Sequence, residues 1–207
     1  MSQMLERYPA AIRMNHWAVT LLFIAAGLSG MAFFHPSLFF FTAFFGGGQW
    51  TRILHPFLGL LMFVSFLGLF MRLWKDNVMN AADKEWRKHT GDMLRGDKSK
   101  MPPVGKYNAG QKTIFWLMAG SLLLMLVTGI FIWRPYFAGS FPIPVLRAAV
   151  LLHSVSAVVL VLSTIVHVYA ALWVKGTIRA MTRGTVSAAW AKANHRLWYE
   201  EVTRGGK

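Results

Sequence analysis

The 207-residue chain contains no cysteine and only eight acidic residues, against 22 Lys and Arg. The absence of cysteine excludes disulfides, protein-ligated iron–sulfur clusters and covalent c-type haem attachment, and it leaves histidine as the plausible metal ligand. The shortage of acids gives a net charge of +14. In a soluble protein such a charge would suggest nucleic acid. Here the basic residues lie between long apolar blocks, so we expect membrane lipids with anionic headgroups as partners and no nucleic acid.

Charge is absent from four long stretches, each of 19 residues or more, which is enough to cross a bilayer as a helix. The predicted transmembrane helices are residues 14–34, 53–71, 113–133 and 148–174. The first stretch is too long for the core of a signal peptide, so we expect it to be retained. The chain, residues 1–207, is therefore expected to be one domain, an all-α integral membrane protein built as a four-transmembrane-helix bundle.

The two long polar segments are expected to be mostly irregular. Residues 72–112 form one long loop, in which Pro102, Pro103 and Gly105 are expected to prevent a helix before Lys112. Residues 175–207 form a basic, partly amphipathic tail. The tail contains three candidate anchors at the membrane interface, Trp190, Trp198 and Tyr199.

The positions of Lys and Arg predict the orientation. Nineteen of the 22 lie in the N-terminal segment, the loop and the tail, and the remaining three are Arg52, Arg134 and Arg147 in the two other connections. Positive residues stay on the cytoplasmic side. Both termini and the 72–112 loop are therefore expected in the cytoplasm, in a multi-pass membrane protein. The four arginines near the membrane surfaces, these three and Arg13, could pair with carboxylate groups of a cofactor.

Two histidines share one face of the last predicted helix. His153 and His167 are fourteen residues apart, which places them about 21 Å apart along the helix axis. That separation is too long for one metal ion and suits two separate sites, one towards each side of the membrane. Polar groups inside a membrane are costly and usually functional. A pair of stacked haems, each held by an imidazole, fits this spacing and predicts an electron carrier across the membrane.

Depth in the membrane predicts the partner of each histidine. His16 lies at the cytoplasmic start of the first helix and His55 at the external start of the second. Depth therefore pairs His55 with His153 and His16 with His167, giving two bis-histidine sites in a four-helix bundle. With both axial positions filled, electron transfer is favoured over oxygen or substrate chemistry. The alternatives are a haem-free transporter whose histidines relay protons or bind metal, and a passive membrane anchor.

Other residues near these sites have competing interpretations. His35 is the rival ligand for the external site, but it precedes Pro36 and is expected to mark a helix end. His89 and His195 lie in polar segments and are expected to be solvated. Small residues one helical turn from a ligand, or on the same face, would leave room for a porphyrin, although they also serve ordinary helix packing. These small residues are Gly30, Gly59, Ala157 and Ala171.

The start of the third helix also allows two interpretations. From the residues alone, Asn108 is expected to be the N-cap of that helix. The amides of Asn108 and Gln111 could instead donate to a quinone carbonyl, with Gly110 allowing close approach of the backbone.

At these residues the chain resembles the γ subunit (cytochrome b556) of membrane-bound respiratory formate dehydrogenases. The resemblance covers about Arg13 to Tyr199, nearly the whole chain. It depends on Arg-Met-Asn-His-Trp at 13–17, Arg-Ile-Leu-His-Pro-Phe at 52–57, Gly-Lys-Tyr-Asn-Ala-Gly-Gln-Lys at 105–112, Ile-Trp-Arg-Pro-Tyr-Phe at 132–137 and His-Val-Tyr-Ala-Ala-Leu-Trp-Val-Lys-Gly at 167–176. Cytochromes b of hydrogenases share the arrangement of the histidines but not this loop sequence. A hydrogenase or other respiratory oxidoreductase subunit is therefore the alternative.

The resemblance implies two b-type haems, one on His55 and His153 and the other on His16 and His167. It also implies a site for quinone, menaquinone or ubiquinone, beside the cytoplasmic haem, formed by Asn108, Gly110, Gln111 and His167. The chain would be the electron-transfer and quinone-reducing subunit of formate dehydrogenase in anaerobic respiration.

The same resemblance implies two partner subunits. An iron–sulfur β subunit would supply electrons from a molybdenum- or tungsten-containing α subunit that oxidises formate outside the membrane, with a higher oligomer of the heterotrimer as a further expectation. The aromatic residues between Phe33 and Gly48 are expected at the external surface, either docking the iron–sulfur subunit or its anchoring helix or settling among lipid headgroups.

Overall fold

The computed structural model describes residues 3–97, 99 and 101–205. They form two compact units, each assembled from separate parts of the chain. The first unit comprises Met1–Arg13, Arg72–Trp116 and Val166–Lys207, and the second comprises Met14–Met71 and Leu117–Ile165. In chain order the elements are β1 Met4–Glu6, α1 Ala10–Phe34, η1 Pro36–Phe45, α2 Gly48–Leu73, η2 Lys75–Asn77, α3 Ala81–Lys88, α4 Thr90–Leu94, α5 Ala109–Ile132, η3 Ala138–Ser140, α6 Ile143–Trp173, α7 Thr177–Thr182, β2 Thr185–Ser187, α8 Ala188–Asn194 and α9 Arg196–Arg204.

The four predicted membrane helices are present as α1, α2, α5 and α6, and all four are long and apolar enough to cross a membrane. Each begins four or five residues before its predicted start. The reason is that a charge-free run ends at the first charged side chain, whereas a helix tolerates charges in its first turns. Lys112 and Arg147, for example, lie inside α5 and α6.

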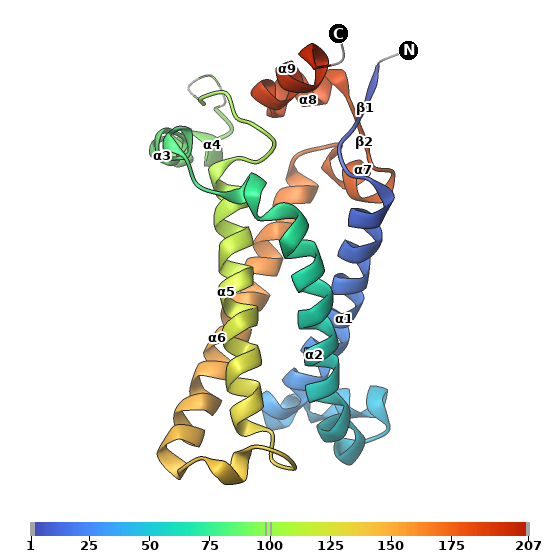
Figure 1. The fold of residues 1–207 in the computed structure, drawn as a ribbon, viewed down its shortest axis with the longest axis vertical. Helices are drawn as coiled ribbons and strands as arrows, with labels where there is room; N and C mark the ends of the chain where they lie inside the picture. The colour runs from blue at the N-terminus through green and yellow to red at the C-terminus, as the bar shows by residue number, and fades with distance from the viewer. Residues whose placement is uncertain (1–2, 98, 100, 206–207) are drawn as a thin grey trace. The chain divides into compact units, whose positions relative to one another are not determined.

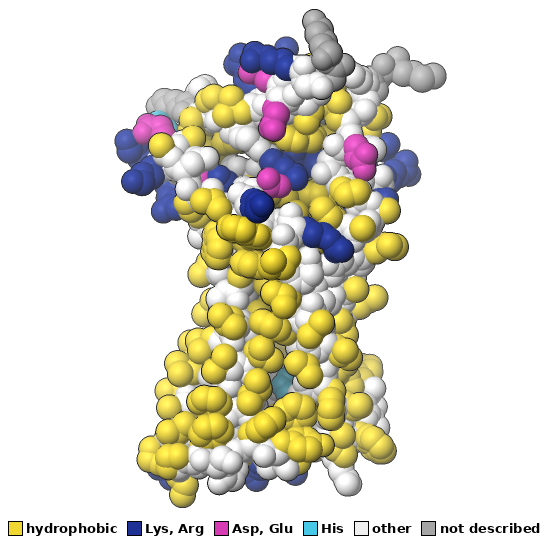
Figure 2. Space-filling view, in the orientation of Figure 1, with side chains coloured by type: hydrophobic (Ala, Val, Ile, Leu, Met, Phe, Trp, Pro, Cys, Tyr) yellow, Lys and Arg dark blue, Asp and Glu magenta, His cyan; other side chains and the backbone are white. Residues whose placement is uncertain are grey.

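The second unit is a bundle of these four helices (Figure 1). Its core takes residues from every helix: Ala26 from α1, Met62 and Phe66 from α2, Leu122 from α5 and Leu160 from α6. Only 17–22% of the most apolar window of each helix is buried. Most apolar side chains therefore lie on the outside, as the hydrophobic surface over these helices shows (Figure 2). Such a surface is compatible with lipid rather than with water.

The first unit joins the two ends of the chain. Its strands β1 and β2 pair antiparallel, with Met4 opposite Ser187. Beside them lies a small core of Tyr8, Ala180, Val186, Ala191 and Trp198. Trp198 is only 6% exposed, and Trp190 and Tyr199 pack against the same core partly buried. The tail is therefore folded, and the interface-anchor interpretation is wrong for Trp198, because burial in a protein core removes it from any lipid contact.

His195 is buried in the first unit, so the expectation that it is solvated is wrong. Its side chain is 3% exposed, with Nδ1 2.9 Å from the Gly105 carbonyl and Nε2 3.4 Å from Nη2 of Arg7. Burial, followed by the positive charge of Arg7, lowers the pKa of His195 to about 4. The neutral ring therefore donates from Nδ1 and accepts from Arg7. His89 remains partly exposed among acidic side chains.

The predicted 72–112 loop contains helices, which corrects the expectation of irregular chain. Helix α3 begins with a reciprocal capping box between Asn80 and Asp83. The carboxylate of Asp83 also pairs with Lys112 at 2.8 Å, and both side chains are buried. Lys112 further donates to the carbonyl of Val78 at 3.0 Å. These contacts link α3 to the first turns of α5, which begins at Ala109 despite the preceding prolines and glycine.

Candidate metal centre

Two histidine rings face each other inside the second unit. His55 projects from α2 and His153 from α6, and their ring centroids lie 6.3 Å apart at 76°. A metal ion bound by one nitrogen of each ring at about 2 Å would hold the two centroids about 6 Å apart. The pair therefore has the spacing of two ligands on opposite sides of one ion. The structure brings together the two histidines that depth in the membrane had paired.

A hydroxyl group on α1 determines the tautomer of His55. The Oγ of Ser29 donates to the Ala26 carbonyl at 2.9 Å and lies 2.9 Å from Nδ1 of His55. A serine hydroxyl has one hydrogen, and that hydrogen is used by the carbonyl. In this arrangement Nδ1 of His55 carries the proton and donates a hydrogen bond to the Oγ of Ser29. The lone pair of the ring is left on Nε2, the atom that binds a metal.

His153 has the same arrangement with α5. The Oγ1 of Thr128 donates to the Leu124 carbonyl at 2.6 Å and lies 3.0 Å from Nδ1 of His153. By the same reasoning His153 carries its proton on Nδ1 and has its lone pair on Nε2. A hydrogen bond to the second nitrogen is the usual way in which a protein orients a metal-binding histidine. Both rings could therefore bind a metal through Nε2.

Two glycines give these rings their space. A Cβ on Gly30 of α1 would lie 3.0 Å from Cε1 of His55, and a Cβ on Gly129 of α5 would lie 3.3 Å from Cε1 of His153. Any larger residue would therefore push against the imidazole. A Cβ on Gly59, by contrast, would meet no described atom within 4 Å. Gly30 thus leaves space for the ring of His55.

Three residues of this site were not predicted from the sequence: Ser29, Thr128 and Gly129. A signal for them exists in the sequence as a hydroxyl residue followed by glycine, Ser29–Gly30 in one helix and Thr128–Gly129 in another. The four helices of the second unit therefore contribute alternately, with α2 and α6 supplying the rings and α1 and α5 supplying the hydroxyl–glycine pairs. This donor set and its open cradle fit a flat metal cofactor held by two imidazoles.

The other predicted histidine pair is divided between the units. His16 belongs to the second unit, where the centroid of its ring lies 5.5 Å from that of Trp17 in an edge-on arrangement. The preceding residue, Asn15, donates from Nδ2 to the Ser65 carbonyl at 2.8 Å. His167 belongs to the first unit and is exposed. Their pairing stays a prediction.

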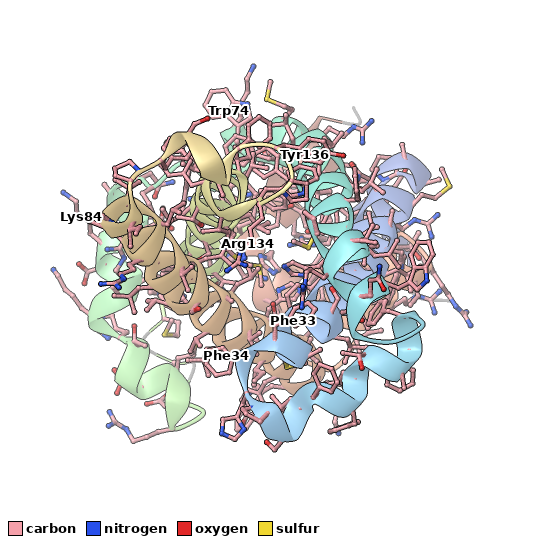
Figure 3. All side chains as sticks on the ribbon, turned by 90° about the horizontal axis from the view of Figure 1, so that it is seen from below. Phe33, Phe34, Trp74, Lys84, Arg134 and Tyr136 are labelled. Atoms are coloured by element: carbon pink, nitrogen blue, oxygen red, sulfur yellow. The ribbon has the colours of Figure 1, made fainter. Side chains whose placement is uncertain are left out.

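His35 ends α1, as its position before proline had predicted. The helix stops at Phe34, and Nδ1 of His35 accepts from the Ser37 amide at 3.2 Å as the N-cap of η1. The ring is exposed and lines an open, mostly apolar cavity of about 480 Å³ with Phe33 and Phe39. Seen from this end, Phe33 and Phe34 lie at the end of α1, and Arg134 lies near the centre of the view (Figure 3).

Three of the four predicted quinone residues, Asn108, Gly110 and Gln111, lie at the start of α5 in the first unit. The Oδ1 of Asn108 accepts from the Gln111 amide at 2.9 Å, and the Oε1 of Gln111 accepts from the Asn108 amide at 3.0 Å. This reciprocal cap confirms Asn108 as the N-cap. A Cβ on Gly110 would lie 3.2 Å from the Trp86 ring of α3. The glycine therefore lets α3 pack closely on α5.

Comparison with known proteins identifies the family. The sequence profile described as prokaryotic cytochrome b561 matches residues 7–184. The formate dehydrogenase cytochrome b556(fdo) subunit of Escherichia coli strain K12 is 47% identical over 198 residues, which cover 96% of this chain and 93% of the relative. The nitrate-inducible cytochrome b556(Fdn) subunit of the same strain is 41% identical over 203 residues, covering 98% and 94%. A formate dehydrogenase cytochrome b556 subunit of Haemophilus influenzae is 42% identical over 195 residues, covering 94% and 82%. These matches confirm the resemblance seen in the sequence: the chain belongs to the prokaryotic cytochrome b561 family, among the cytochrome b556 subunits of formate dehydrogenases.

Proposed function

We propose that the chain is a dihaem cytochrome b subunit that takes electrons from an external iron–sulfur subunit of formate dehydrogenase and reduces quinone at the cytoplasmic side. The observation that carries this proposal is the facing pair His55 and His153, each prepared by a hydroxyl group as an Nδ1–H tautomer. A b-type haem bound by this pair supplies a one-electron carrier inside the membrane. The chain would act as one cytochrome b domain.

The protein groups favour electron transfer over chemistry on small molecules. His55 and His153 would together hold the iron, so a haem bound there would carry electrons rather than bind oxygen or substrate. Ser29 and Thr128 hold the rings, and Gly30 and Gly129 keep the adjacent space clear. By the same chemistry His16 and His167 would hold the second haem.

The positive charges support the proposed orientation. Lys and Arg gather over the first unit, which contains both termini (Figure 2). The positive-inside rule puts these residues in the cytoplasm of a bacterium and the His55–His153 pair towards the external side. Arg134 lies on that external side, where it could pair with a haem propionate. The exposed Phe34, Phe40 and Phe44 would dock the iron–sulfur subunit, which receives electrons from the catalytic subunit.

Quinone reduction takes up protons as well as electrons, so its site needs hydrogen-bond donors close to water. The helix cap uses the oxygen atoms of Asn108 and Gln111. The NH₂ group of each amide can therefore still donate to a quinone carbonyl. His167 would complete the site from α6. Protons would come from the cytoplasm while electrons come from outside, so that turnover builds a membrane potential.

The direct test is a reduced-minus-oxidised spectrum of the chain purified with the subunits that accompany it. We expect b-type bands, two haems per chain, and a co-purifying iron–sulfur subunit that confers formate-dependent quinone reduction. Absence of haem would refute the cytochrome proposal and favour a transporter or an anchor.

Replacing Gly30 by Ala is expected to reduce haem bound at the His55 site. The new methyl group would lie 3.0 Å from the imidazole and force the ring to move. Gly27→Ala, in the same helix α1, is the matched control, because a Cβ there would meet no described atom within 4 Å. Both changes improve helix propensity by a similar amount. Haem content by alkaline pyridine assay should therefore fall in Gly30→Ala alone. Equal haem content in both variants would show that the site does not depend on the space Gly30 leaves for the His55 ring.

Replacing Asn108 by Asp and Gln111 by Glu is expected to slow reoxidation of the haems by quinone. The carboxylate oxygens can still accept the two backbone N–H bonds of the cap, but the NH₂ donors are gone. Stopped-flow spectroscopy should show slower haem reoxidation by quinone with unchanged haem reduction by the partner subunit. If reoxidation is unchanged while the helix remains capped, Asn108 and Gln111 have only a structural role.

A further inference from the structure

Ser29 and Thr128 are buried hydroxyl residues on the two helices that carry neither of the facing histidines. Ser29 is fully buried, and Thr128 is 3% exposed. Each hydroxyl donates its hydrogen to a carbonyl of its own helix, that of Ala26 or Leu124. Each oxygen is then able only to accept a hydrogen bond from the imidazole beside it. The backbone of α1 and of α5 thus determines where the imidazole proton lies.

This arrangement has a chemical consequence at the opposite nitrogen of each ring. An imidazole that donates a hydrogen bond from Nδ1 becomes more basic at Nε2 and a stronger donor to a metal. A stronger donor stabilises ferric iron more than ferrous iron and so lowers the midpoint potential of a haem. A ring without this hydrogen bond could also adopt the other tautomer, which presents the wrong nitrogen.

We propose that Ser29 and Thr128 are positioning residues that hold His55 and His153 as Nδ1–H tautomers and lower the midpoint potential of the haem between them. This rests on the proposed function, because a potential can be measured only where a haem is bound. The two helices that carry neither ligand of this haem would therefore control the electron affinity of the site.

The experiment compares variants that remove a hydroxyl with variants that keep it. Thr128→Val preserves the shape of the side chain and removes the acceptor, whereas Thr128→Ser keeps the acceptor; Ser29→Ala and Ser29→Thr form the corresponding pair. Thr164→Val is the matched control, since the Thr164 hydroxyl donates to the Leu160 carbonyl in the same way on α6. Each variant is purified as the complete complex, and its haems are titrated optically and examined by electron paramagnetic resonance.

We expect Thr128→Val and Ser29→Ala to raise the midpoint potential of one haem and change its resonance spectrum, with wild-type values in Thr128→Ser, Ser29→Thr and Thr164→Val. If Ser29→Ala loses that haem altogether, the shape-conserving Thr128→Val variant still reports the potential. This inference alone is overturned if the wild-type complex holds two haems but neither hydroxyl-deleted variant changes their potentials or spectra. A wild-type complex without haem overturns the proposed function as well.

Discussion

Replacing His153 by Ala is expected to remove one haem and to abolish electron transfer from the partner subunit to quinone. The ring of His153 lies opposite that of His55, and a single imidazole is a much weaker hold than two on opposite sides of one ion. Pyridine assay should show haem falling from two per chain to one, and formate-dependent quinone reduction should be lost. His55→Ala should give the same result, whereas His167→Ala should remove the other haem.

His35→Ala is the matched control for these ligand changes. His35 belongs to the same unit as His55 and His153 and directly follows α1, close in sequence to Ser29 and Gly30. Its Nδ1 accepts a hydrogen bond from the Ser37 amide in a helix cap. Both haems and full activity should be retained. Retention of two haems in His153→Ala, or their loss in His35→Ala, would reject the assignment of the external site.

Replacing Lys112 by Met is expected to destabilise the first unit by about 3–5 kcal/mol. Lys112 and Asp83 are both buried, with 2.8 Å between Nζ and Oδ2. Without the ammonium group, the carboxylate of Asp83 remains buried without its counter-charge, and α3 loses its link to α5. Chemical unfolding in detergent, followed by tryptophan fluorescence, to which Trp86 and Trp116 near the pair contribute, measures the change.

Lys88→Met provides the comparison. Lys88 pairs with Glu85 on the same short helix α3, but the two side chains are 70% and 50% exposed. A surface pair of this kind contributes little to stability. Its loss should leave the unfolding transition unchanged. The double variant Lys112→Met with Asp83→Asn should recover part of the stability, since it removes both buried charges together. Equal effects of Lys112→Met and Lys88→Met would show that the buried pair has no special importance.

Quantities that depend on local composition could be predicted without a structure. A run of apolar residues without charge must form its hydrogen bonds within itself in a membrane, so the four helices follow from composition alone. The fourteen-residue spacing of His153 and His167 follows from helix geometry. Asn108 as an N-cap likewise depends only on residues within one turn. The helix starts were misplaced because a charge marks the edge of the apolar block and not the first helical residue.

Contacts between distant residues decided the rest. His195 was expected in solvent, but Arg7 and Gly105, 188 and 90 residues away, surround it. Asp83, in the segment expected to be an irregular loop, is buried because it pairs with Lys112, 29 residues later. These errors share one cause, since a polar residue is exposed or buried according to partners that the local sequence does not contain.

The sequence by itself determined which helices are long and apolar enough to cross a membrane, and it paired His55 with His153, whose rings the structure brings together. The side that each helix end faces stays a prediction of the positive-inside rule. The rotation of each helix about its axis was decided only by tertiary packing. That rotation turns Ser29 and Gly30 towards His55, and Thr128 and Gly129 towards His153. Depth depends on position along a helix, which residue spacing specifies. The direction in which a side chain faces depends on how side chains from four helices fill a common interior, and no single segment contains that information.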